Sequence, residues 1–363
     1  MSTRYDERDT MFSRARLQPG TKRYREYYAR HPHVQAGDDA LRGMDITKSL
    51  RVDAAFKARF FPLREHRHAL VKALHDTVDQ TPPATDRVAV PGTFASNIKA
   101  IVKHYGAGDV GIVKLMPKHY YSHHGGVSEA RGLDNYGEPI LPRYQTAIVY
   151  AVPMNRAYVN RAPGFEAMLE TDNAYDKVAF TGSRLALYLK ALGYHTVFQS
   201  ELYYETPLVP LAYDGGLGEI GMANHLVHPR FGNAIRLGAV LTTLQIDADK
   251  PIDFGLKAFC KRCALCLMNC PSQAIKPSER IREGRTFYRF DDQRCFQLWK
   301  NTGTDCSTCL SSCPFTQGID AITIEAMQHD PAIIDDVIQA HLDAHSRRPY
   351  QKHPLEIVKK EDA

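Results

Sequence analysis

The sequence predicts a mixed fold, α/β or α+β, in which a larger domain of helices and strands precedes a small cysteine-rich one. Two observations lead to this prediction. Short apolar runs rich in β-branched residues alternate with long amphipathic segments through residues 41–255, which is typical of strands and helices within one domain. All eight cysteines then fall between Cys260 and Cys313, which indicates a second, compact module.

Composition divides the chain into four segments. Residues 1–40 are charged and rich in tyrosine and arginine, and we interpret them as an arm that wraps a neighbouring surface, with disorder as the alternative. Residues 41–255 form the large domain, and residues 256–320 form the cysteine module. Residues 321–363 mix acidic and basic side chains in a helical pattern, so we expect a helical tail packed on the outside.

Individual elements can be assigned within the large domain. Residues 53–78 have an amphipathic helical pattern, and residues 174–199 indicate a long helix, closed by Gly193, followed by a strand. Three further apolar runs predict strands, namely residues 109–116, 146–154 and 233–246.

Composition and charge exclude several classes of protein. Apolar residues make up 44% of the chain and charged residues 24%, which is ordinary for a soluble globular protein. The formal net charge of +5 comes without a clustered basic face, so nucleic acid is not an expected partner. No apolar run approaches the ~20 residues needed to cross a bilayer, and the N-terminus lacks the apolar stretch of a secretory signal. We therefore expect a cytoplasmic protein without a membrane partner, whose cysteines are ligands rather than disulfides.

The cysteine spacing is that of a two-cluster ferredoxin. CKRCALCLMNCP begins at Cys260, and a second run ends in CSTCLSSCP, with the cysteine before each proline expected to ligate the other cluster. One [4Fe–4S] cluster is then assigned Cys260, Cys263, Cys266 and Cys313, and the other Cys270, Cys295, Cys306 and Cys309. Zinc is the alternative, because paired cysteines also bind zinc, but it would leave the Cys-Pro positions without a reason. Ten residues between Cys295 and Cys306 predict an inserted loop.

A glycine-rich stretch, GGLGEIG, contains the spacing G-x-G-x-x-G through Gly216, Gly218 and Gly221. A dinucleotide site needs this motif between a buried strand and a helix. Here Pro207 and Pro210 interrupt the preceding segment. The glycines are therefore expected to let the backbone approach another large, flat cofactor or the cluster module.

The segment from Tyr213 to Ile275, which runs from this glycine stretch into the first cysteine run, resembles the core of the reductive dehalogenases. The opening ERDTMFSRARLQPGTKRYREYYARHP is similar to the N-terminal segment of that family's cytoplasmic members without a fused reductase. The resemblance covers roughly residues 5–318. One departure is Met222, where the family usually has an arginine soon after Gly-Leu-Gly-Glu.

The resemblance implies a nitroreductase-like domain that binds cobalamin in a base-off state beside two [4Fe–4S] clusters. It also implies an oxidoreductase that replaces the halogen of an organohalide by hydrogen, with electrons from an external ferredoxin- or flavodoxin-type donor. The D-x-H-x-x-G signature of corrinoid proteins with a histidine on cobalt is absent, since YSHHGG has Tyr121 at the aspartate position. We therefore expect no protein histidine on the cobalt.

The same resemblance implies the catalytic residues. Tyr175 occupies the place of the family's proton-donating tyrosine, and Arg236 that of its cationic partner, which would lower the pKa of the phenol. The alternatives are a core tyrosine and a surface salt bridge. Helical spacing puts Thr171, Tyr175, Val178, Gly182, Leu185 and Leu189 on one face. Weaker candidates for the substrate or cofactor pocket are Phe12, Thr171, Gln199, Ser200, Gly216, Gly218 and Trp299.

Two other functions remain open at this point. The first is epoxyqueuosine reductase, a related cobalamin and two-cluster enzyme that acts on tRNA, although DCSTCLSSCPF differs from that family's pattern. The second is a non-catalytic electron carrier made of a ferredoxin module on an inert domain.

Overall fold

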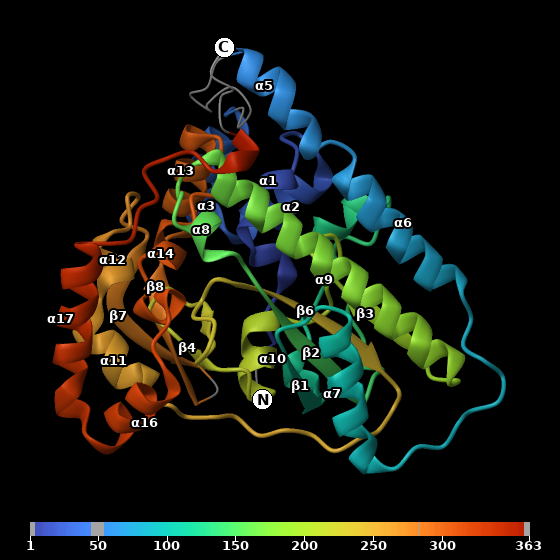
Figure 1. The fold of residues 1–363 in the computed structure, drawn as a ribbon. Helices are drawn as coiled ribbons and strands as arrows, with labels where there is room; N and C mark the ends of the chain where they lie inside the picture. The colour runs from blue at the N-terminus through green and yellow to red at the C-terminus, as the bar shows by residue number, and fades with distance from the viewer. Residues whose placement is uncertain (1–3, 45–53, 283, 359–363) are drawn as a thin grey trace.

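A computed structural model describes residues 4–44, 54–282 and 284–358, and a four-stranded sheet lies at its centre (Figure 1). The sheet has the order β1-β2-β6-β3, and each neighbouring pair is antiparallel. The bounds of its strands are Asp109–Lys114 for β1, Thr146–Pro153 for β2, Thr196–Gln199 for β3 and Ile235–Thr242 for β6. The four predicted strands are confirmed, and their antiparallel pairing makes this domain α+β.

Both faces of the sheet are buried beneath helices. One face packs against α9, α6 and α7, and the other against α10 and the segment from Lys114 to Tyr144. Along β2, Ile148 and Tyr150 join the first core, whereas Ala147 and Val149 join the second. Successive side chains of a strand point to opposite faces, so a strand covered on both sides is apolar throughout. The helices are α6 (Arg67–Gln80), α7 (Ala95–His104), α9 (Phe165–Ala191) and α10 (Leu208–Asp214).

Two glycines let α9 lie close to the sheet. A Cβ on Gly182 would come within 2.5 Å of the Tyr150 hydroxyl, and one on Gly238 within 2.6 Å of the same side chain. The Tyr150 hydroxyl donates a 2.7 Å hydrogen bond to the carbonyl of Val178. The predicted face of α9 is buried on the sheet apart from Tyr175, which is half-buried. The helix begins nine residues before the predicted start at 174 and ends before Gly193, whose φ is +85°.

The N-terminal arm is a set of short helices packed on one another. Its own core is formed by Leu17, Tyr24, Tyr27 and Tyr28, and buried Arg14 pairs with Asp38 at 2.9 Å. Gln293 of α13 donates a hydrogen bond to the carbonyl of Val34, which ties the arm to the cysteine module. Residues 4–44 are therefore ordered as helices. The elements are η1 (Glu7–Asp9), α1 (Met11–Arg16), α2 (Lys22–Arg30) and α3 (Pro32–Arg42).

The amphipathic pattern predicted from residue 53 to 78 is interrupted. Helix α5 (Ala54–Phe60) is followed by the 3₁₀ turn η2 (Phe61–Leu63), and α6 begins at Arg67. Pro62 cannot donate a helical hydrogen bond, and His66 has a left-handed φ of +63°. A periodic apolar pattern does not detect such a break.

The cysteine module combines short helices with a hairpin. Its elements are α11 (Leu256–Cys263), α12 (Leu265–Met268), β7 (Ile275–Arg282), β8 (Arg285–Phe290), α13 (Asp292–Thr302), α14 (Thr308–Ser311) and α15 (Pro314–Gln317). The predicted inserted loop between Cys295 and Cys306 is mainly helical, since α13 continues to Thr302. The glycine stretch follows α10 and enters a small hairpin of β4 (Glu219–Ile220) and β5 (Leu226–Val227). It has none of the strand-to-helix geometry of a dinucleotide site.

The C-terminal tail is helical, as predicted, and lies along the outside of the cysteine module (Figure 1). Its elements are α16 (Ala321–His329), η6 (Pro331–Ile333), α17 (Ile334–His345) and η7 (Glu356–Val358). The remaining short elements are η3 (Gly92–Phe94), η4 (Pro117–His119), η5 (Val127–Arg131) and α8 (Arg156–Val159).

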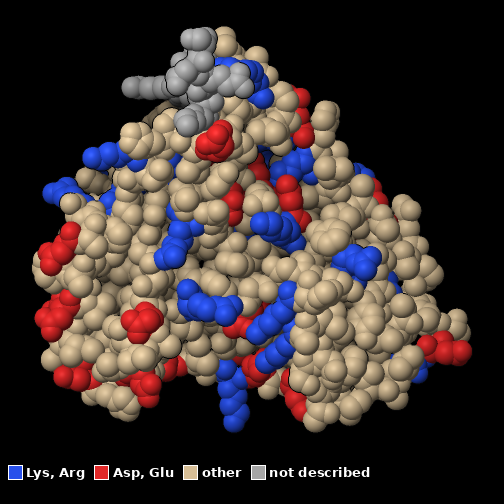
Figure 2. Space-filling model, in the orientation of Figure 1, with Lys and Arg blue, Asp and Glu red and all other residues tan. Residues whose placement is uncertain are grey.

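Charges of both signs are spread over the face of the molecule drawn in Figure 2. Several basic side chains gather near its centre, and acidic ones lie along the edge occupied by α16 and α17. Among the described residues, none of the helices combines the length and apolarity that crossing a membrane requires.

Candidate active site

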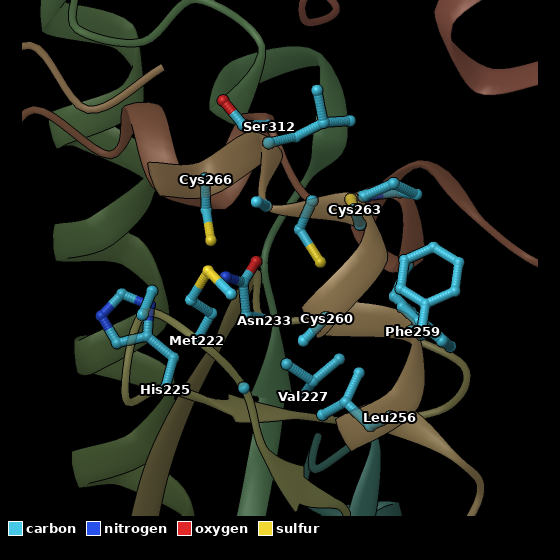
Figure 3. Close-up of a pocket in the computed structure, with 17 residues that line it drawn as sticks. Met222, His225, Val227, Asn233, Leu256, Phe259, Cys260, Cys263, Cys266 and Ser312 are labelled. Carbon is cyan, nitrogen blue, oxygen red and sulfur yellow. The ribbon is translucent and has the colours of Figure 1, made fainter. Parts of the chain in front are cut away.

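Four of the cysteines surround a small pocket between α11 and the glycine-rich hairpin. Cys260, Cys263, Cys266 and Cys313 all line this pocket. Figure 3 shows the first three around it, with Met222 and Asn233 beside them. These are the four cysteines that the spacing assigned to one cluster. Cys313 is far from the other three in the sequence, and the fold brings it beside them.

The other four cysteines line a separate and larger cavity. They are Cys270, Cys295, Cys306 and Cys309. Burial is the main cause that raises the pKa of Cys309, and the charges of Cys306, Cys295 and Cys270 raise it further. These four sulfur atoms therefore lie close to one another. The two groups match the crossed assignment predicted from the sequence, in which each cysteine before a proline joins the other run.

Backbone amides point at the sulfur atoms of the first group. The N–H of Met222 donates to Cys260, and that of Asn233 donates to Cys313. Hydrogen bonds to cluster sulfurs stabilise the added charge of a reduced cluster and so help to set its potential. At Met222, where the family usually has arginine, it is the backbone that contacts the cysteine.

Burial makes most of these thiols poor acids in the absence of iron. It raises the pKa of Cys263 to about 12, and burial together with Cys306 raises that of Cys295 to about 12. Cys270 differs, because hydrogen bonds from Ser272 and nearby backbone amides outweigh burial and lower its pKa. Metal binding must therefore displace protons from most of the eight sulfurs, so loading iron is coupled to their deprotonation.

The larger cavity has a volume of about 350 Å³ and reaches from the second cysteine group to α9. Its apolar wall comes from β5, β6 and α10, and its aromatic side chains come from α1, α9, the turn after β3, β8 and α13. That combination of apolar surface with a few polar groups is typical of ligand sites. The apolar and aromatic lining includes Phe12, Tyr175, Tyr204, Leu208, Val209, Leu226, Ile235, Leu237 and Trp299.

Tyr175 and Arg236 meet at the end of this cavity. Arg236 pairs with Val152 in the sheet register, on the face that packs against α9, and its Cζ lies 5.3 Å from the centroid of the Tyr175 ring. Its Nη2 donates to the hydroxyl of Thr171 at 3.0 Å and lies 3.6 Å from the carboxylate of Asp305. These partners are held on α9 and beside Cys306, so the guanidinium joins the helix to the cysteine module.

The pKa of Tyr175 is raised above its ordinary value because burial outweighs the opposing effect of Arg236. The arginine lowers this pKa, as expected from the sequence, but Glu201 and Asp305 add to the effect of burial. The net pKa of Tyr175 nevertheless stays above the ordinary tyrosine value. Tyr175 is a protonated phenol at neutral pH and carries a proton that it can donate.

A second arginine lies over the same ring. The Cζ of buried Arg67 is 5.7 Å from the centroid of Tyr175, and its Nη2 donates to Glu201 Oε1. Its Nε lies 2.7 Å from the carboxylate of Asp176. Tyr175 is thus flanked by two guanidinium groups, each of which has a carboxylate partner.

Known proteins resemble this chain in sequence and in fold. A 4Fe-4S dicluster domain model matches residues 259–325. Over 190 residues the chain is 31% identical to the tetrachloroethene reductive dehalogenase of Sulfurospirillum multivorans, a match that covers 50% of this chain and 38% of that protein. Over about half of its length the chain is therefore similar in sequence to reductive dehalogenases.

Two solved reductive dehalogenases have the same fold. The catabolic reductive dehalogenase NpRdhA superposes with a TM-score of 0.72 at 21% identity, over 95% of this chain and 47% of its own. A structure described as suggesting a mechanism for B12-dependent dehalogenation gives 0.69 at 21% identity, over 85% of this chain and 46% of its own. The chain thus spans less than half the length of these relatives. Proteins named epoxyqueuosine reductase also match, but one such match covers only 37% of this chain.

The lining of the larger cavity has the chemistry to hold a corrinoid. Buried polar atoms without a hydrogen-bond partner among the described residues include Arg236 Nε, Glu201 Oε2, Asp305 Oδ1 and His225 Nδ1. All four residues line the cavity. A corrinoid ring is apolar on its faces and carries carboxamides, which both donate and accept hydrogen bonds. An apolar wall with unpartnered donors and acceptors suits such a group.

The sequence candidates separate into two sets. Phe12, Ser200 and Trp299 line the cavity, and Thr171 contacts it through Arg236. Gln199 instead binds the hydroxyl of Thr206 and two backbone amides within a buried turn. Gly216 and Gly218 pack against backbone, since a Cβ would come within 2.5 Å of the Lys250 carbonyl and 2.2 Å of the Val227 carbonyl. These three residues are not among those that line the cavity.

Sequence reasoning missed several polar residues of the cavity, among them Glu201, Tyr204, His225 and Asp305. Glu201 and Tyr204 follow β3 in a turn, and His225 follows the glycine stretch, so nothing in their spacing distinguishes them from loop residues. The sequence does contain a signal for Asp305 as a site residue. It directly precedes Cys306, and a carboxylate beside a negatively charged cluster is unfavourable unless a cation is near.

Proposed function

We propose that this protein is a corrinoid-dependent reductive dehalogenase, which converts an organohalide, two electrons and one proton into the hydrogen-substituted product and a halide ion. The observation that carries the proposal is the shared cavity: Tyr175, Arg236 and four cysteines of one cluster group line the same space. A proton donor and an electron relay therefore face one site, as this reaction requires.

The eight cysteines would hold two [4Fe–4S] clusters in the two groups described above. The group of Cys270, Cys295, Cys306 and Cys309 lines the cavity and would pass electrons into it. The group of Cys260, Cys263, Cys266 and Cys313 would receive them from an external ferredoxin- or flavodoxin-type donor.

Cobalamin would lie in the cavity between Tyr175 and the second cysteine group, held by the apolar wall and by the unpartnered polar atoms around it. When bound, it supplies a strongly reducing cobalt centre for cleavage of the carbon–halogen bond. The chain's own residues exclude water from the apolar wall, hold the substrate at Tyr175 and deliver the proton.

Tyr175 would give its hydroxyl proton to the carbon that loses the halogen. Arg236 favours the phenolate that remains, because a neighbouring cation stabilises the negative charge. Thr171 and Asp305 hold the guanidinium in position through its Nη2. A cytoplasmic location stays a prediction from the sequence.

The test combines an absorption spectrum of the extracted cofactor with halide release from organohalides and a chemically reduced donor. Corrinoid together with halide release supports the proposal. Corrinoid with turnover of epoxyqueuosine-containing tRNA would establish the related tRNA-modifying reaction instead, and iron–sulfur absorbance without corrinoid would leave an electron carrier.

A further inference from the structure

Helix α11 and the β7–β8 hairpin lie side by side and are together strongly basic (Figure 1). Residues 256–263 and 275–290 contain eight lysines and arginines but only two glutamates. The two elements are in contact, because Lys257 of α11 donates a 3.1 Å hydrogen bond to the hydroxyl of Thr286 on β8. The fold thus gathers cations from two separate stretches of the sequence onto one surface, which would attract an acidic partner.

Two lysines on this side of α11 share one carboxylate. Glu279 of β7 lies 3.1 Å from the Nζ of Lys261 and 3.9 Å from that of Lys257. Both lysine side chains are 54% exposed. A single carboxylate cannot neutralise two ammonium groups, so this side keeps a positive charge. On the other side of α11, Arg262 pairs with Asp335 of α17, and the surplus therefore lies toward the hairpin.

An exposed apolar side chain lies within this basic surface. Ile281 of β7 is 65% exposed, and its partner in the strand register is Thr286, the residue that Lys257 contacts. Partners on adjacent strands project from the same face of a sheet, so Ile281 is a neighbour of Lys257. An apolar centre with a charged rim is the usual composition of a protein–protein interface.

The same helix carries ligands of the first cysteine group. Lys261 directly follows Cys260, and α11 ends at Cys263. Both cysteines line the small pocket of that group, whereas the second group lines the larger cavity. Electrons that enter at this surface would therefore reach the first group before the second group and the cavity.

We propose that the side of α11 that faces the hairpin, with Lys257, Lys261 and Ile281, is the docking surface for a small acidic ferredoxin. The charge of the surface requires an acidic partner, and its place beside the first cysteine group favours an electron carrier over a nucleic acid. One electron passes at each encounter: the ferredoxin cluster is oxidised and a cluster of this protein is reduced, with no bond made or broken. This proposal rests on the proposed function, because it names where that reaction receives its electrons.

The experiment measures how fast the clusters of the loaded protein are reduced, by anaerobic rapid mixing and absorption spectroscopy. The probes are a reduced plant-type [2Fe–2S] ferredoxin, which is acidic, and reduced methyl viologen, a small cation that a basic surface does not attract. Lys257→Gln combined with Lys261→Gln should slow reduction by ferredoxin about 10-fold at low salt, the lower end of the range for electrostatic steering. The difference should shrink as salt is added, because counterions screen exposed charges. Reduction by methyl viologen should not slow.

Lys72→Gln combined with Lys103→Gln is the matched control. These lysines lie on α6 and α7 of the large domain, and their side chains are 41% and 49% exposed. Each is also paired with an aspartate, so the control removes the same charge from similar surroundings. It should be reduced by ferredoxin as fast as wild type.

Several outcomes would overturn the docking surface. Equal rates with ferredoxin for wild type and the Lys257/Lys261 variant would do so. Equal losses with both reductants would show that the lysines only tune the potential of the cluster. Dependence of a flavodoxin, but not of ferredoxin, on the two lysines would make the assigned partner wrong, and loss of tRNA binding in this variant with unchanged ferredoxin rates would assign the surface to RNA. If ferredoxin reduces the clusters through these lysines but no halide is released from organohalides, the proposed function fails and the docking surface stands.

Discussion

The guanidinium of Arg236 lies over the ring of Tyr175, with 5.3 Å between its Cζ and the ring centroid. The two residues come from different layers of the fold, one from the central strand β6 and the other from the long helix α9. Gly238, two residues along the strand, leaves room for α9 at this crossing. The packing of helix on sheet therefore fixes the distance between the proposed proton donor and its cation.

Tyr175→Phe should keep the clusters and the corrinoid but lose most turnover. General acid catalysis contributes on the order of 10²- to 10⁴-fold, and phenylalanine has no proton to give. Halide release under one reduced donor measures the loss, with iron and corrinoid content as controls. Turnover within about threefold of wild type, well below that range, would end the proton-donor assignment.

Arg236→Met should also slow the reaction, because the arginine is the main group that opposes the raised pKa of Tyr175. Combined with Tyr175→Phe, it should add little further loss if the two act as one unit. The double variant, assayed beside both single variants, decides this. Losses that simply multiply would show that Arg236 acts independently of Tyr175.

The raised pKa of Tyr175 predicts the alkaline side of the pH profile. An acid catalyst works in its protonated form, so its contribution is present below its pKa and is lost as the pH rises through it. Burial raises this pKa above the ordinary tyrosine value of 10.0. We therefore expect kcat/KM to show no decline due to Tyr175 between pH 7 and about pH 10. A descending limb near pH 8 that disappears in Tyr175→Phe would contradict this expectation.

Much of the fold followed from periodicity, and much of the cysteine chemistry from spacing. The strands that cross the core are apolar on both faces, and the two ferredoxin-like runs predict the cysteine groups that the structure brings together. The break at Pro62 and the helical region after Cys295 were not predicted, because both depend on local backbone geometry. The spatial grouping of the cysteines agrees with the assignment, but iron ligation itself stays a prediction.

The polar half of the cavity could not be predicted. Glu201 and His225 lie in turns, and they reach the cavity only because β3 and the small hairpin end beside it. The net effect on the pKa of Tyr175 was also beyond sequence reasoning, which identifies a nearby cation but not the degree of burial. Gln199 is the opposite case, because it was predicted to line the pocket and does not. It lies at the end of a strand, and its side-chain oxygen accepts hydrogen bonds from two backbone amides.

The two cysteine groups predict separable metal losses. Wild type should contain about eight iron atoms and eight sulfides per chain. Cys306→Ser should remove the cluster beside the cavity and abolish electron delivery. Cys263→Ser should remove the other cluster and leave about four iron atoms in place. Iron analysis and electron paramagnetic resonance of the reduced variants measure this, and zinc at two per chain with little iron would refute the assignment.

His225 allows a direct test of how cobalt is held. Among the described residues that line the cavity it is the only histidine, and its Nδ1 is buried without a partner. The absence of a D-x-H-x-x-G loop predicts that no protein histidine binds cobalt, so Nδ1 should instead meet a carboxamide of the corrinoid. Protein with isotope-labelled histidine should therefore show no imidazole hyperfine coupling in the Co(II) spectrum, and His225→Ala should leave that spectrum unchanged while weakening corrinoid retention. Coupling from a labelled imidazole that disappears in His225→Ala would identify His225 as a ligand and overturn the prediction.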